Sequence, residues 1–411
     1  MAIIFAHFRP TLAWLSQRLR SMQNSSAAES PLIATVTTNP SIDQHIVIDR
    51  LVKDDAIRAR EIRRDPGGKG LNVSRVLAEL GGPTIAFGIT GGGAGYIVKS
   101  LLREHGIAFE SVEVLQETRI NFILTDRSDG TQTRISAPGP WVTLEEAERL
   151  FDLAVGHRPQ ALWWVLGGSL PRGVPTDFYA RVIRQLRRRN ARPFLDADDD
   201  ALKIGIETRP YGIKPNESEL ARLVGRELRD DAQILDAARD VVASGVDVVA
   251  VTLAERGALV VSESAAIRAR TPRVEVRSKV GAGDSFLAGF VLGLSRGDSL
   301  EAATRLGTAA GTAAVIHEGT QLCRGRDVAA LLPRIAVEHL PLPTRGDSAP
   351  RNRTPSIDLV CGMEVDPGLA DFEASHGGGR YRFCSLACQR EFEADPLRYL
   401  SRSDGVLPKR R

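Results

Sequence analysis

Short apolar runs rich in β-branched residues alternate with longer amphipathic stretches through most of the chain. The runs are typical of buried strands, and they are Ile33 to Thr37, Thr84 to Ile89, Ala161 to Leu166, Pro193 to Asp196 and Val246 to Thr252. Each is followed by a stretch of helix length with apolar residues on one side. This alternation predicts an α/β fold in which a mostly parallel sheet is flanked by helices.

Two other segments alternate apolar and polar residues at period two, which indicates strands with one face in water. They are His45 to Leu51 and Asn121 to Ser136, and a turn sequence at Arg127 to Gly130 divides the second. We expect these segments to form a small β lid beside the main sheet. An open edge of such a sheet favours pairing with another strand.

Composition agrees with a soluble enzyme, because 43% of the 411 residues are hydrophobic and can bury a large core. The net charge of +3 is too small to indicate a nucleic-acid partner. No segment is apolar over a length that spans a bilayer. Four cysteines in a chain of this length are no disulfide framework, so we expect a reducing, cytoplasmic location.

Both ends of the chain depart from the alternating pattern. Residues 1–31 form a basic extension, which is either a targeting segment or the product of a start codon placed too early, and we favour the second interpretation. Residues 336–356 are rich in proline and polar residues and are predicted to be a linker. The predicted domains are therefore residues 32–335 and 357–402, followed by a basic tail at 403–411.

A glycine-rich turn carries a carboxylate where an apolar helical pattern begins. Gly281, Ala282 and Gly283 precede Asp284, and the helical pattern follows. Small residues let backbone amides approach an anion, and the N-terminal end of a helix dipole stabilises negative charge there. The carboxylate can take a proton from an attacking hydroxyl. By itself, however, the turn fits a phosphate site and an ordinary tight turn about equally well.

Four upstream segments decide between these interpretations. They are Asn39 to Asp43, Pro66 to Val73, Thr118 to Asn121 and Lys214 to Glu219, and the Asp284 turn follows them as the fifth segment. In this order they resemble the PfkB branch of the ribokinase-like sugar kinases, and the phosphofructokinases in particular. The resemblance implies a ribokinase-like fold, ATP and Mg²⁺ as cofactors, a phosphorylated hexose as acceptor, and a homodimer formed through the lid.

The resemblance implies three groups of site residues. The base and the anion hole are Asp284, Gly281, Ala282 and Gly283. The groups that bind the acceptor and its phosphate are Asp43, Gly67, Gly68, Lys69, Asn72, Arg119 and Arg58. The groups that bind ATP and Mg²⁺ are Lys214, Asn216, Glu219, Thr252 and Gly257.

Some of these residues also have plainer interpretations. Arg58 and Lys69 are either phosphate ligands or solvated charges of the lid, in a segment dense in arginine. Asn216 and Glu219 offer the oxygen ligands that Mg²⁺ prefers, and they also fit the start of a helix. Arg119 is the cation that matches the phosphofructokinase pattern most directly, and its guanidinium can grip phosphate in a fork.

Several residues depart from the family pattern. Ala254 stands where the nucleotide loop usually has glycine, and its Cβ would crowd the phosphates if its φ is positive. Lys279 adds a cation beside the glycine turn. Asp198 and Asp199 add negative charge that either holds a cation or lies in solvent, and we favour solvent. A lysine at position 69 resembles the pattern of 1-phosphofructokinase and tagatose 6-phosphate kinase, so the position of the substrate's phosphate stays open.

The C-terminal segment resembles a YHS domain, a small α+β module related to the TRASH metal-binding modules. Cys361, Cys384 and Cys388 have the spacing C-x22-C-x3-C, with the last two one helical turn apart. Thiolates in this arrangement favour Zn²⁺ or Cu⁺, and His376 is the nearest candidate for a fourth ligand. The alternative is a metal-free module whose cysteines are buried apolar side chains.

The sequence therefore predicts an ATP-dependent kinase that converts fructose 6-phosphate to fructose 1,6-bisphosphate. Two alternatives within the family are 1-phosphofructokinase and tagatose 6-phosphate kinase. An alternative of another class is a metal-responsive binding protein with a degenerate kinase domain, which Ala254 and Lys279 would favour. The intact Asp43, Glu219 and Asp284 favour the enzyme.

Overall fold

A computed structural model gives the arrangement of most of the chain. It describes residues 31–158, 160–342, 356–360, 364–365, 372–377, 379–383 and 386–400. The N-terminal extension up to residue 30, most of the predicted linker and the basic tail lie outside these ranges. Residues 31–342 form the main body, and the described residues from 356 onward form a C-terminal module.

Ten strands form the main sheet, in the order β14-β13-β12-β11-β10-β9-β8-β1-β4-β5. The strands are β1 (Ile33–Thr37), β4 (Thr84–Gly91), β5 (Ala108–Val114), β8 (Trp163–Gly167), β9 (Arg192–Asp196), β10 (Gly212–Ile213), β11 (Val248–Thr252), β12 (Ala258–Ser262), β13 (Ala266–Arg270) and β14 (Ala336–Leu340). The seven from β5 to β11 pair in parallel, and the other three pairings are antiparallel. The predicted mostly parallel sheet is therefore confirmed.

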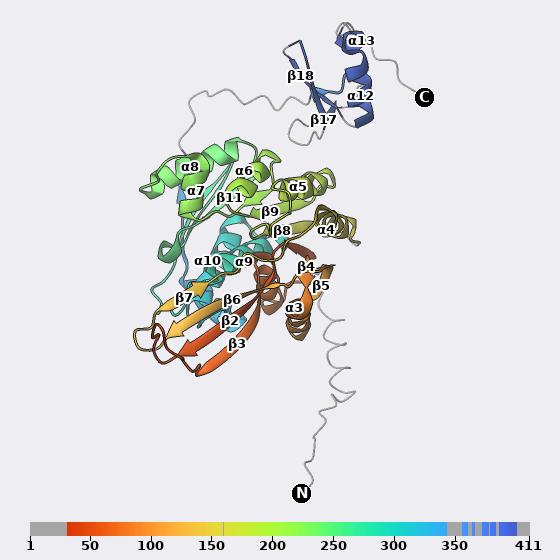
Figure 1. Cartoon of the computed structure of the whole chain (residues 1–411). Helices are drawn as coiled ribbons and strands as arrows, with labels where there is room; N and C mark the ends of the chain where they lie inside the picture. The colour runs from red at the N-terminus through yellow and green to blue at the C-terminus, as the bar shows by residue number, and fades with distance from the viewer. Residues whose placement is uncertain are drawn as a thin grey trace, which may run out of the picture. The chain divides into compact units, whose positions relative to one another are not determined.

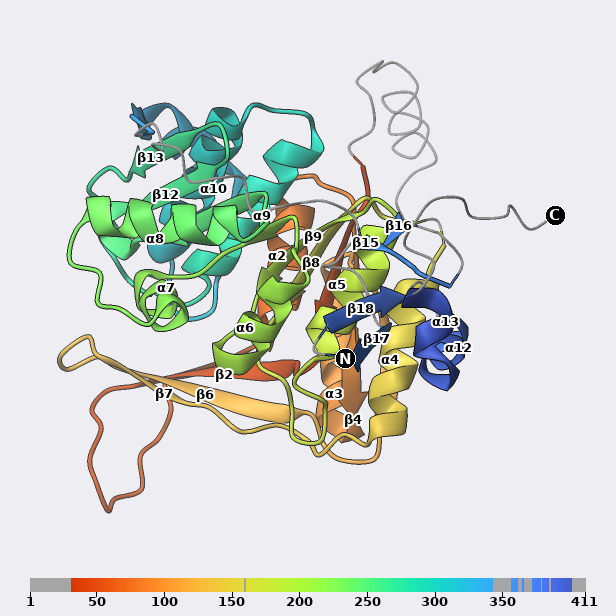
Figure 2. The ribbon, with the colours of Figure 1, turned by 90° about the horizontal axis from the view of Figure 1, so that it is seen from above.

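Helices cover both faces of this sheet (Figures 1 and 2). One face packs against α4 (Leu144–Gly156), α5 (Phe178–Arg188), α6 (Asp199–Glu207), α7 (Glu217–Val224) and α8 (Asp231–Ala243). The other face packs against α2 (Lys69–Glu79), α3 (Gly92–Glu104), α9 (Ala282–Ser295), α10 (Leu300–Val315) and α11 (Gly325–Leu331). Two short 3₁₀ turns complete the body, η1 (Ala254–Arg256) and η2 (Leu332–Arg334). Because both faces are buried, the strands are continuous apolar runs.

Four strands form the lid, in the order β3-β2-β6-β7. They are β2 (Ser41–Ile48), β3 (Glu61–Gly67), β6 (Arg119–Asp126) and β7 (Gln132–Ile135), and they lie together at one side of the body (Figures 1 and 2). Residues 127–130 form the turn between β6 and β7, as predicted. The arginine-rich segment, which we considered as solvated charge, continues into β3. Its backbone pairs with β2 even though its side chains are charged.

The predicted end of the body at residue 335 is wrong by one strand. β14 begins at Ala336 and pairs with β13 from Ala266↔Leu340 to Arg270↔Ala336. Its side chains are mostly exposed, so it lacks the apolar run by which the inner strands were found. Proline and polar residues follow this edge strand directly in the sequence, and their composition extended the predicted linker too far upstream.

The C-terminal module has four short strands and two helices among its described residues. They are β15 (Ser356–Ile357), β16 (Glu364–Val365), β17 (Phe372–His376), β18 (Gly379–Phe383), α12 (Leu386–Ala394) and α13 (Pro396–Leu400). The hydrophobic core of its described residues is formed by buried Ala374, Phe383, Phe392 and Tyr399. Such a small core gives little stability by itself.

Candidate active site

Two cavities meet beside the N-terminus of α9. The acceptor cavity, of about 910 Å³, lies between the lid and the carboxyl ends of the parallel strands. The nucleotide cavity, of about 830 Å³, lies against η1, α9 and α10. The residues that line both are Asn216, Thr252, Val276, Lys279 and Gly283. A molecule in either cavity would therefore come close to the glycine-rich turn.

That turn forms the start of α9, as its sequence predicts. Gly281 is the N-cap residue with a φ of 75°, and a Cβ there would lie 2.3 Å from Leu322. The first-turn amides of a helix have no partner within it, so they can bind an anion. Gly281 lines the acceptor cavity, Ala282 lines the nucleotide cavity and Gly283 lines both, so the turn lies between them.

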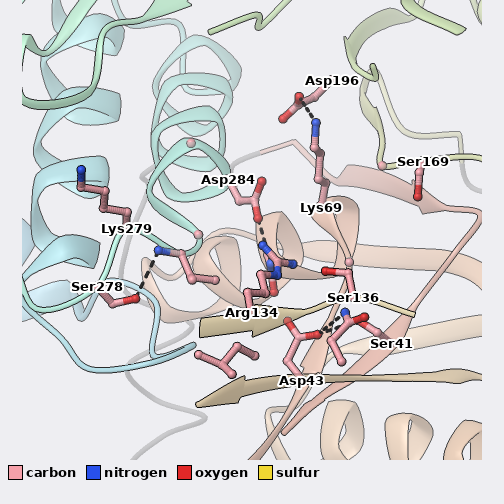
Figure 3. Close-up of a pocket in the computed structure, with 18 of the residues that line it drawn as sticks. Ser41, Asp43, Lys69, Arg134, Ser136, Ser169, Asp196, Ser278, Lys279 and Asp284 are labelled. Atoms are coloured by element: carbon pink, nitrogen blue, oxygen red, sulfur yellow. Dashed lines mark hydrogen bonds and ion pairs between the residues drawn. The ribbon is translucent and has the colours of Figure 1, made fainter. Parts of the chain in front are cut away.

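Asp284 lies half-buried in the first turn of α9 and lines the acceptor cavity (Figure 3). Its Oδ2 accepts a hydrogen bond of 2.8 Å from Nδ2 of Asn72. Burial raises the pKa of Asp284, and the charge of Asp196 adds to the rise. The Asn72 hydrogen bond and the ammonium groups of Lys69 and Lys214 oppose it. A carboxyl group with a raised pKa is suited to proton transfer.

Asp43 on β2 is a buried carboxylate that also lines the acceptor cavity. Its Oδ1 accepts hydrogen bonds of 2.8 Å from the Ser41 hydroxyl and 2.8 Å from Nδ2 of Asn121. Within the described residues no hydrogen bond reaches its Oδ2, which leaves that oxygen for a ligand hydroxyl. A Cβ on Gly67 would lie 2.5 Å from this carboxyl group, so glycine is required there.

Lys69 points to the strand ends of the main sheet. Its Nζ lies 3.0 Å from Oδ1 of Asp196 and 3.0 Å from Oδ1 of Asp198, and the first contact is drawn in Figure 3. Lys214 Nζ lies 3.3 Å from the other oxygen of Asp196. Burial works against the charge of each group, yet the pairing raises the pKa of Lys69 and lowers that of Asp196. Asp198 is therefore part of an ion-pair network, whereas we expected it in solvent.

Two arginines line the lid side of the acceptor cavity, Arg119 on β6 and Arg134 on β7. Arg119 donates to the backbone oxygens of Ala137 and Asn39, at 3.1 and 3.0 Å. Arg134 is exposed and forms no ion pair within the described part of the chain. Burial lowers the pKa of Arg119, and the neighbouring charge of Arg134 contributes to the shift. Two adjacent cations without a shared carboxylate are suited to binding a phosphate.

Sequence reasoning missed Arg134 and included Arg58. Arg134 pairs in register with Ile123, which also lines the cavity, so the alternation of the lid strands could have identified it. Arg58 is exposed in the loop between β2 and β3 and is not among the residues that line either cavity. Gly68, Lys69 and Asn72 do line the acceptor cavity.

Asn216 and Glu219 form the first turn of α7. Oδ1 of Asn216 accepts from the Glu219 amide, and Oε2 of Glu219 accepts from the Asn216 amide, both at 2.8 Å. This capping box is the plainer interpretation that we weighed. The pair nevertheless lines the acceptor cavity, and Oε1 of Glu219 is not used in the box. Hard oxygen donors facing a cavity fit Mg²⁺, which keeps several of its own waters.

The nucleotide loop has the strain that its sequence suggested. Ala254 in η1 has a φ of 51°, a conformation that suits glycine, and it lines the nucleotide cavity. Gly257 has a φ of 98°, and a Cβ there would lie 2.2 Å from the Ala269 oxygen. Thr252 lines both cavities. Lys279 is exposed at the junction and forms no ion pair with the described residues; in the view of Figure 3 it lies across Asp284 from Lys69.

The predicted metal ligands of the C-terminal module are only partly described. Cys361 and Cys384 lie outside the described residues, and Cys388 is half-buried on α12. His376 ends β17. Among the residues that the structure describes, no group of three or more His, Cys, Asp or Glu side chains could hold a metal ion. No described helix is long and apolar enough to cross a membrane.

Comparison with known families assigns both parts of the chain. The model of the pfkB family of carbohydrate kinases matches residues 36–325, and that of the YHS domain matches residues 356–403. The first match runs from the end of β1 to beyond β13 and includes the lid and the residues that line both cavities. The second covers the C-terminal module.

Relatives match about three quarters of the chain. ATP-dependent 6-phosphofructokinase isozyme 2 of Mycobacterium tuberculosis is 36% identical over 299 residues, 72% of this chain and 88% of that protein. A 1-phosphofructokinase of Bacillus subtilis is 33% identical over 309 residues, 75% of this chain and 100% of that protein. The tetrameric inhibited form of phosphofructokinase-2 from Escherichia coli superposes with a TM-score of 0.70 at 32% identity, over 74% of this chain and 99% of that one.

Proposed function

The chain belongs to the pfkB family of carbohydrate kinases, and from this we propose that it transfers a phosphoryl group from ATP to fructose 6-phosphate, giving fructose 1,6-bisphosphate. It is a sugar kinase of the phosphofructokinase type. The observation that carries the proposal is the position of Asp284, held by Asn72 beside an anion hole at the junction of two cavities. The alternative acceptors are fructose 1-phosphate and tagatose 6-phosphate.

In the proposed mechanism Asp43 and Asp284 act on the same acceptor. Asp43 accepts hydrogen bonds from sugar hydroxyls and orients the acceptor, while Asp284 takes the proton of the attacking hydroxyl. The hydroxyl oxygen bonds to the γ-phosphorus as the bond to ADP breaks. The amides of Gly281, Ala282 and Gly283, together with Lys214, stabilise the negative charge of the transferred group.

Mg²⁺ and the nucleotide would occupy the region around α7 and η1. When it is bound, Mg²⁺ neutralises negative charge on the phosphate oxygens. Asn216 and Glu219 would hold it, in part through water, while keeping the first turn of α7 in place. Thr252 and Gly257 would contact the nucleotide, because both line the cavity that extends along α9 and α10.

The acceptor would carry its own phosphate at the lid. Arg119 and Arg134 lie next to one another there, and no carboxylate of the described chain pairs with Arg134. Lys69 is already paired with Asp196 and Asp198, so we assign it to the transfer end of the cavity. Because Lys69 is paired, there is less reason to expect it to bind the acceptor's phosphate. Its identity is therefore weak evidence for where that phosphate lies on the sugar.

The proposed function is tested by ADP release from purified protein with Mg·ATP and each of five acceptors: fructose 6-phosphate, fructose 1-phosphate, tagatose 6-phosphate, fructose and adenosine. Turnover with fructose 6-phosphate alone, lost in Asp284→Ala, is the expected result. Preference for another phosphorylated ketohexose would change the substrate and leave the chemistry. Folded protein without turnover on any acceptor would support the alternative of a degenerate kinase in a metal-responsive binding protein.

We further propose that the lid forms a homodimer. Its face away from Asp43 carries Ile46 beside Ile62 and Leu124, and Phe122 beside Ile135. Ile62 and Ile135 are 55% and 57% exposed, which makes an apolar surface on an open sheet. Ile62→Lys should lower the mass in analytical ultracentrifugation, while Leu144→Lys on α4, where the side chain is 58% exposed, should not.

For the C-terminal module we propose a Zn²⁺ or Cu⁺ site formed by Cys361, Cys384 and Cys388. The cysteine spacing and the four-residue buried core support it, since a small module gains stability from a metal. Metal analysis of full-length protein tests the site: about one equivalent is expected, and Cys388→Ser should lose it. We also propose a cytoplasmic location, where ATP and sugar phosphates are available.

A further inference from the structure

Arg75 is a buried arginine on α2 that lines neither cavity. Its side chain is 8% exposed. One terminal nitrogen, Nη1, donates to the Pro66 oxygen at 3.0 Å and to Oδ1 of Asn72 at 3.2 Å. The other, Nη2, donates to Oδ1 of Asp65 at 3.3 Å. A buried cation is costly unless it is paired, so these contacts define where the guanidinium must lie.

The contact with Asn72 determines which way its amide points. A guanidinium only donates hydrogen bonds, so the group facing Arg75 must be the Asn72 oxygen. The NH₂ group of the same amide then faces the other way, and it donates to Oδ2 of Asp284 at 2.8 Å. Without Arg75, the amide could turn and present its oxygen to the carboxylate. Arg75 therefore selects the orientation in which Asn72 stabilises ionised Asp284.

Asp65 connects Arg75 to the lid. It lies on β3, and its Oδ2 accepts from Nε of Arg63 at 3.0 Å and from the hydroxyl of Thr320. Thr320 lies in the segment that follows α10. The contacts of this one carboxylate thus join a lid strand, α2 and the segment after α10.

We propose that Arg75 is a positioning residue for Asp284: it fixes the Asn72 amide so that its NH₂ group holds the carboxylate, and its bond to Asp65 ties that arrangement to the lid. The inference rests on the proposed role of Asp284 as the base. It adds a chain of contacts, Asp65–Arg75–Asn72, through which the seating of β3 affects the reacting carboxylate.

Other charged groups also act on Asp284. Asp196 on β9 disfavours its ionised form, and Lys69 on α2 and Lys214 before α7 favour it. All three remain in place when Arg75 is replaced. A change in the pKa of Asp284 in an Arg75 variant therefore has two possible sources: loss of the Arg75 charge and loss of the Asn72 orientation. Arg75→Lys separates them, because it keeps the charge.

The first test compares Arg75→Met with Arg75→Lys in the full-length protein. For Arg75→Met we expect kcat to fall about tenfold to a hundredfold, as for other small displacements of a reacting group, with the sugar KM within about twofold. The acid limb of the kcat/KM profile should move up by about one pH unit, because the freed amide no longer donates. Arg75→Lys keeps the charge but cannot reach three acceptors, so it should recover only part of kcat. Wild-type kinetics in folded Arg75→Met, or full recovery by lysine, would overturn the orientation role.

A double-mutant cycle gives the result if Arg75→Met does not fold. We expect Arg75→Lys to lower kcat in the wild-type background but to have less than about a twofold effect in Asn72→Ala, since the intermediary is gone. Effects that multiply independently would overturn the inference.

A readout without turnover separates this inference from the proposed function. Carboxyl ¹³C NMR, with the Asp284 signal assigned from Asp284→Asn, gives the pKa of Asp284 directly. We expect that pKa to be higher in Arg75→Met than in the wild type, and an unchanged value would overturn the positioning role. Wild-type protein inactive on every acceptor would overturn the proposed function alone, because the NMR comparison would still decide the role of Arg75.

Discussion

In the acceptor cavity, two carboxylates accept hydrogen bonds from side-chain amides: Asp43 from Asn121 and Asp284 from Asn72. In the nucleotide cavity, Ala254 has a backbone conformation that suits glycine, and the exposed Lys279 has no ion-pair partner among the described residues. The two cavities share the glycine-rich turn. On the acceptor side the carboxylates themselves are held by neighbouring side chains, whereas on the nucleotide side the polar contacts hold η1 from behind, through Arg256 with Glu217 and Asp231. Proton transfer needs fixed geometry, whereas nucleotide binding is spread over backbone and apolar surface and tolerates substitution.

The largest effect should come from Asp284→Asn, which removes the base and keeps the shape. We expect kcat to fall about 10²- to 10⁴-fold, with the KM for ATP little changed. Coupled assays of ADP release measure both. A variant that keeps more than a tenth of wild-type kcat would contradict the role of Asp284 and reduce the difference between the two cavities.

The same substitution should stabilise the protein at neutral pH. Because the pKa of Asp284 is raised in the folded state, its ionised form destabilises that state above the folded pKa. Below the ordinary pKa of aspartate, both folded and unfolded states are protonated and the difference vanishes. The urea midpoint of Asp284→Asn should therefore exceed that of the wild type at pH 8 and approach it as the pH falls. Equal midpoints at pH 8 would show that the carboxylate is not strained by burial.

Arg134→Gln should have the next largest effect. A hydrogen bond to a charged group contributes about 1.5–3 kcal/mol, so the KM for fructose 6-phosphate should rise about tenfold to a hundredfold. The KM for ATP should not change, because Arg134 does not line the nucleotide cavity. Arg127→Gln is the matched control, because Arg127 lies in the turn of the same hairpin and does not line the cavity. Equal effects of the two variants would mean that Arg134 acts through general charge.

How far the sequence predicted the structure depends on what each prediction used. Periodicity and the order of motifs were enough for the main sheet, the lid hairpin and the turn at Asp284, because local residue pattern determines these elements. Strands β3 and β14 escaped, since their exposed, charged side chains carry no apolar signal. Pairing with a neighbouring strand, which sequence periodicity does not reveal, is what makes each of them a strand.

Side-chain partners were the least predictable part of the site. Lys69 was assigned to substrate phosphate, yet its ammonium pairs with Asp196 and Asp198, more than a hundred residues away in the sequence. Arg75 gave no signal of its own, because its pairing with Asp65 depends on how α2 packs against β3, which the residue pattern does not reveal. Ala254 was the exception: the consequence of its side chain depended on one dihedral angle, which the structure supplies.

Ala254→Gly should improve the nucleotide cavity. A left-handed conformation costs a residue with a Cβ about 1–2 kcal/mol, and glycine removes this cost. The greater freedom of glycine in the unfolded chain offsets part of the stability gained. We expect the KM for ATP to fall about two- to fivefold, because phosphate can approach the backbone more closely. Ala254→Ser keeps the Cβ and should give no improvement. A fall in KM for both variants would locate the effect elsewhere.

Lys279→Thr should have the smallest effect and the opposite sign. An exposed cation contributes about 0.2–1 kcal/mol to binding an anion, so the KM for ATP should rise no more than about fivefold. The rise should shrink at high ionic strength, because salt screens exposed charges, and Lys279→Arg should behave as the wild type.

Combining this substitution with Ala254→Gly tests whether Lys279 compensates for the strained loop. Both residues line the nucleotide cavity, on different segments. If each acts on ATP by itself, the two changes in KM should multiply and nearly cancel in the double variant, as for independent sites. If Lys279 matters only while Ala254 keeps the phosphates from the backbone, then Lys279→Thr should have no effect once residue 254 is glycine. Isothermal titration with a non-hydrolysable ATP analogue distinguishes these outcomes, because it measures binding apart from the chemistry of the acceptor cavity.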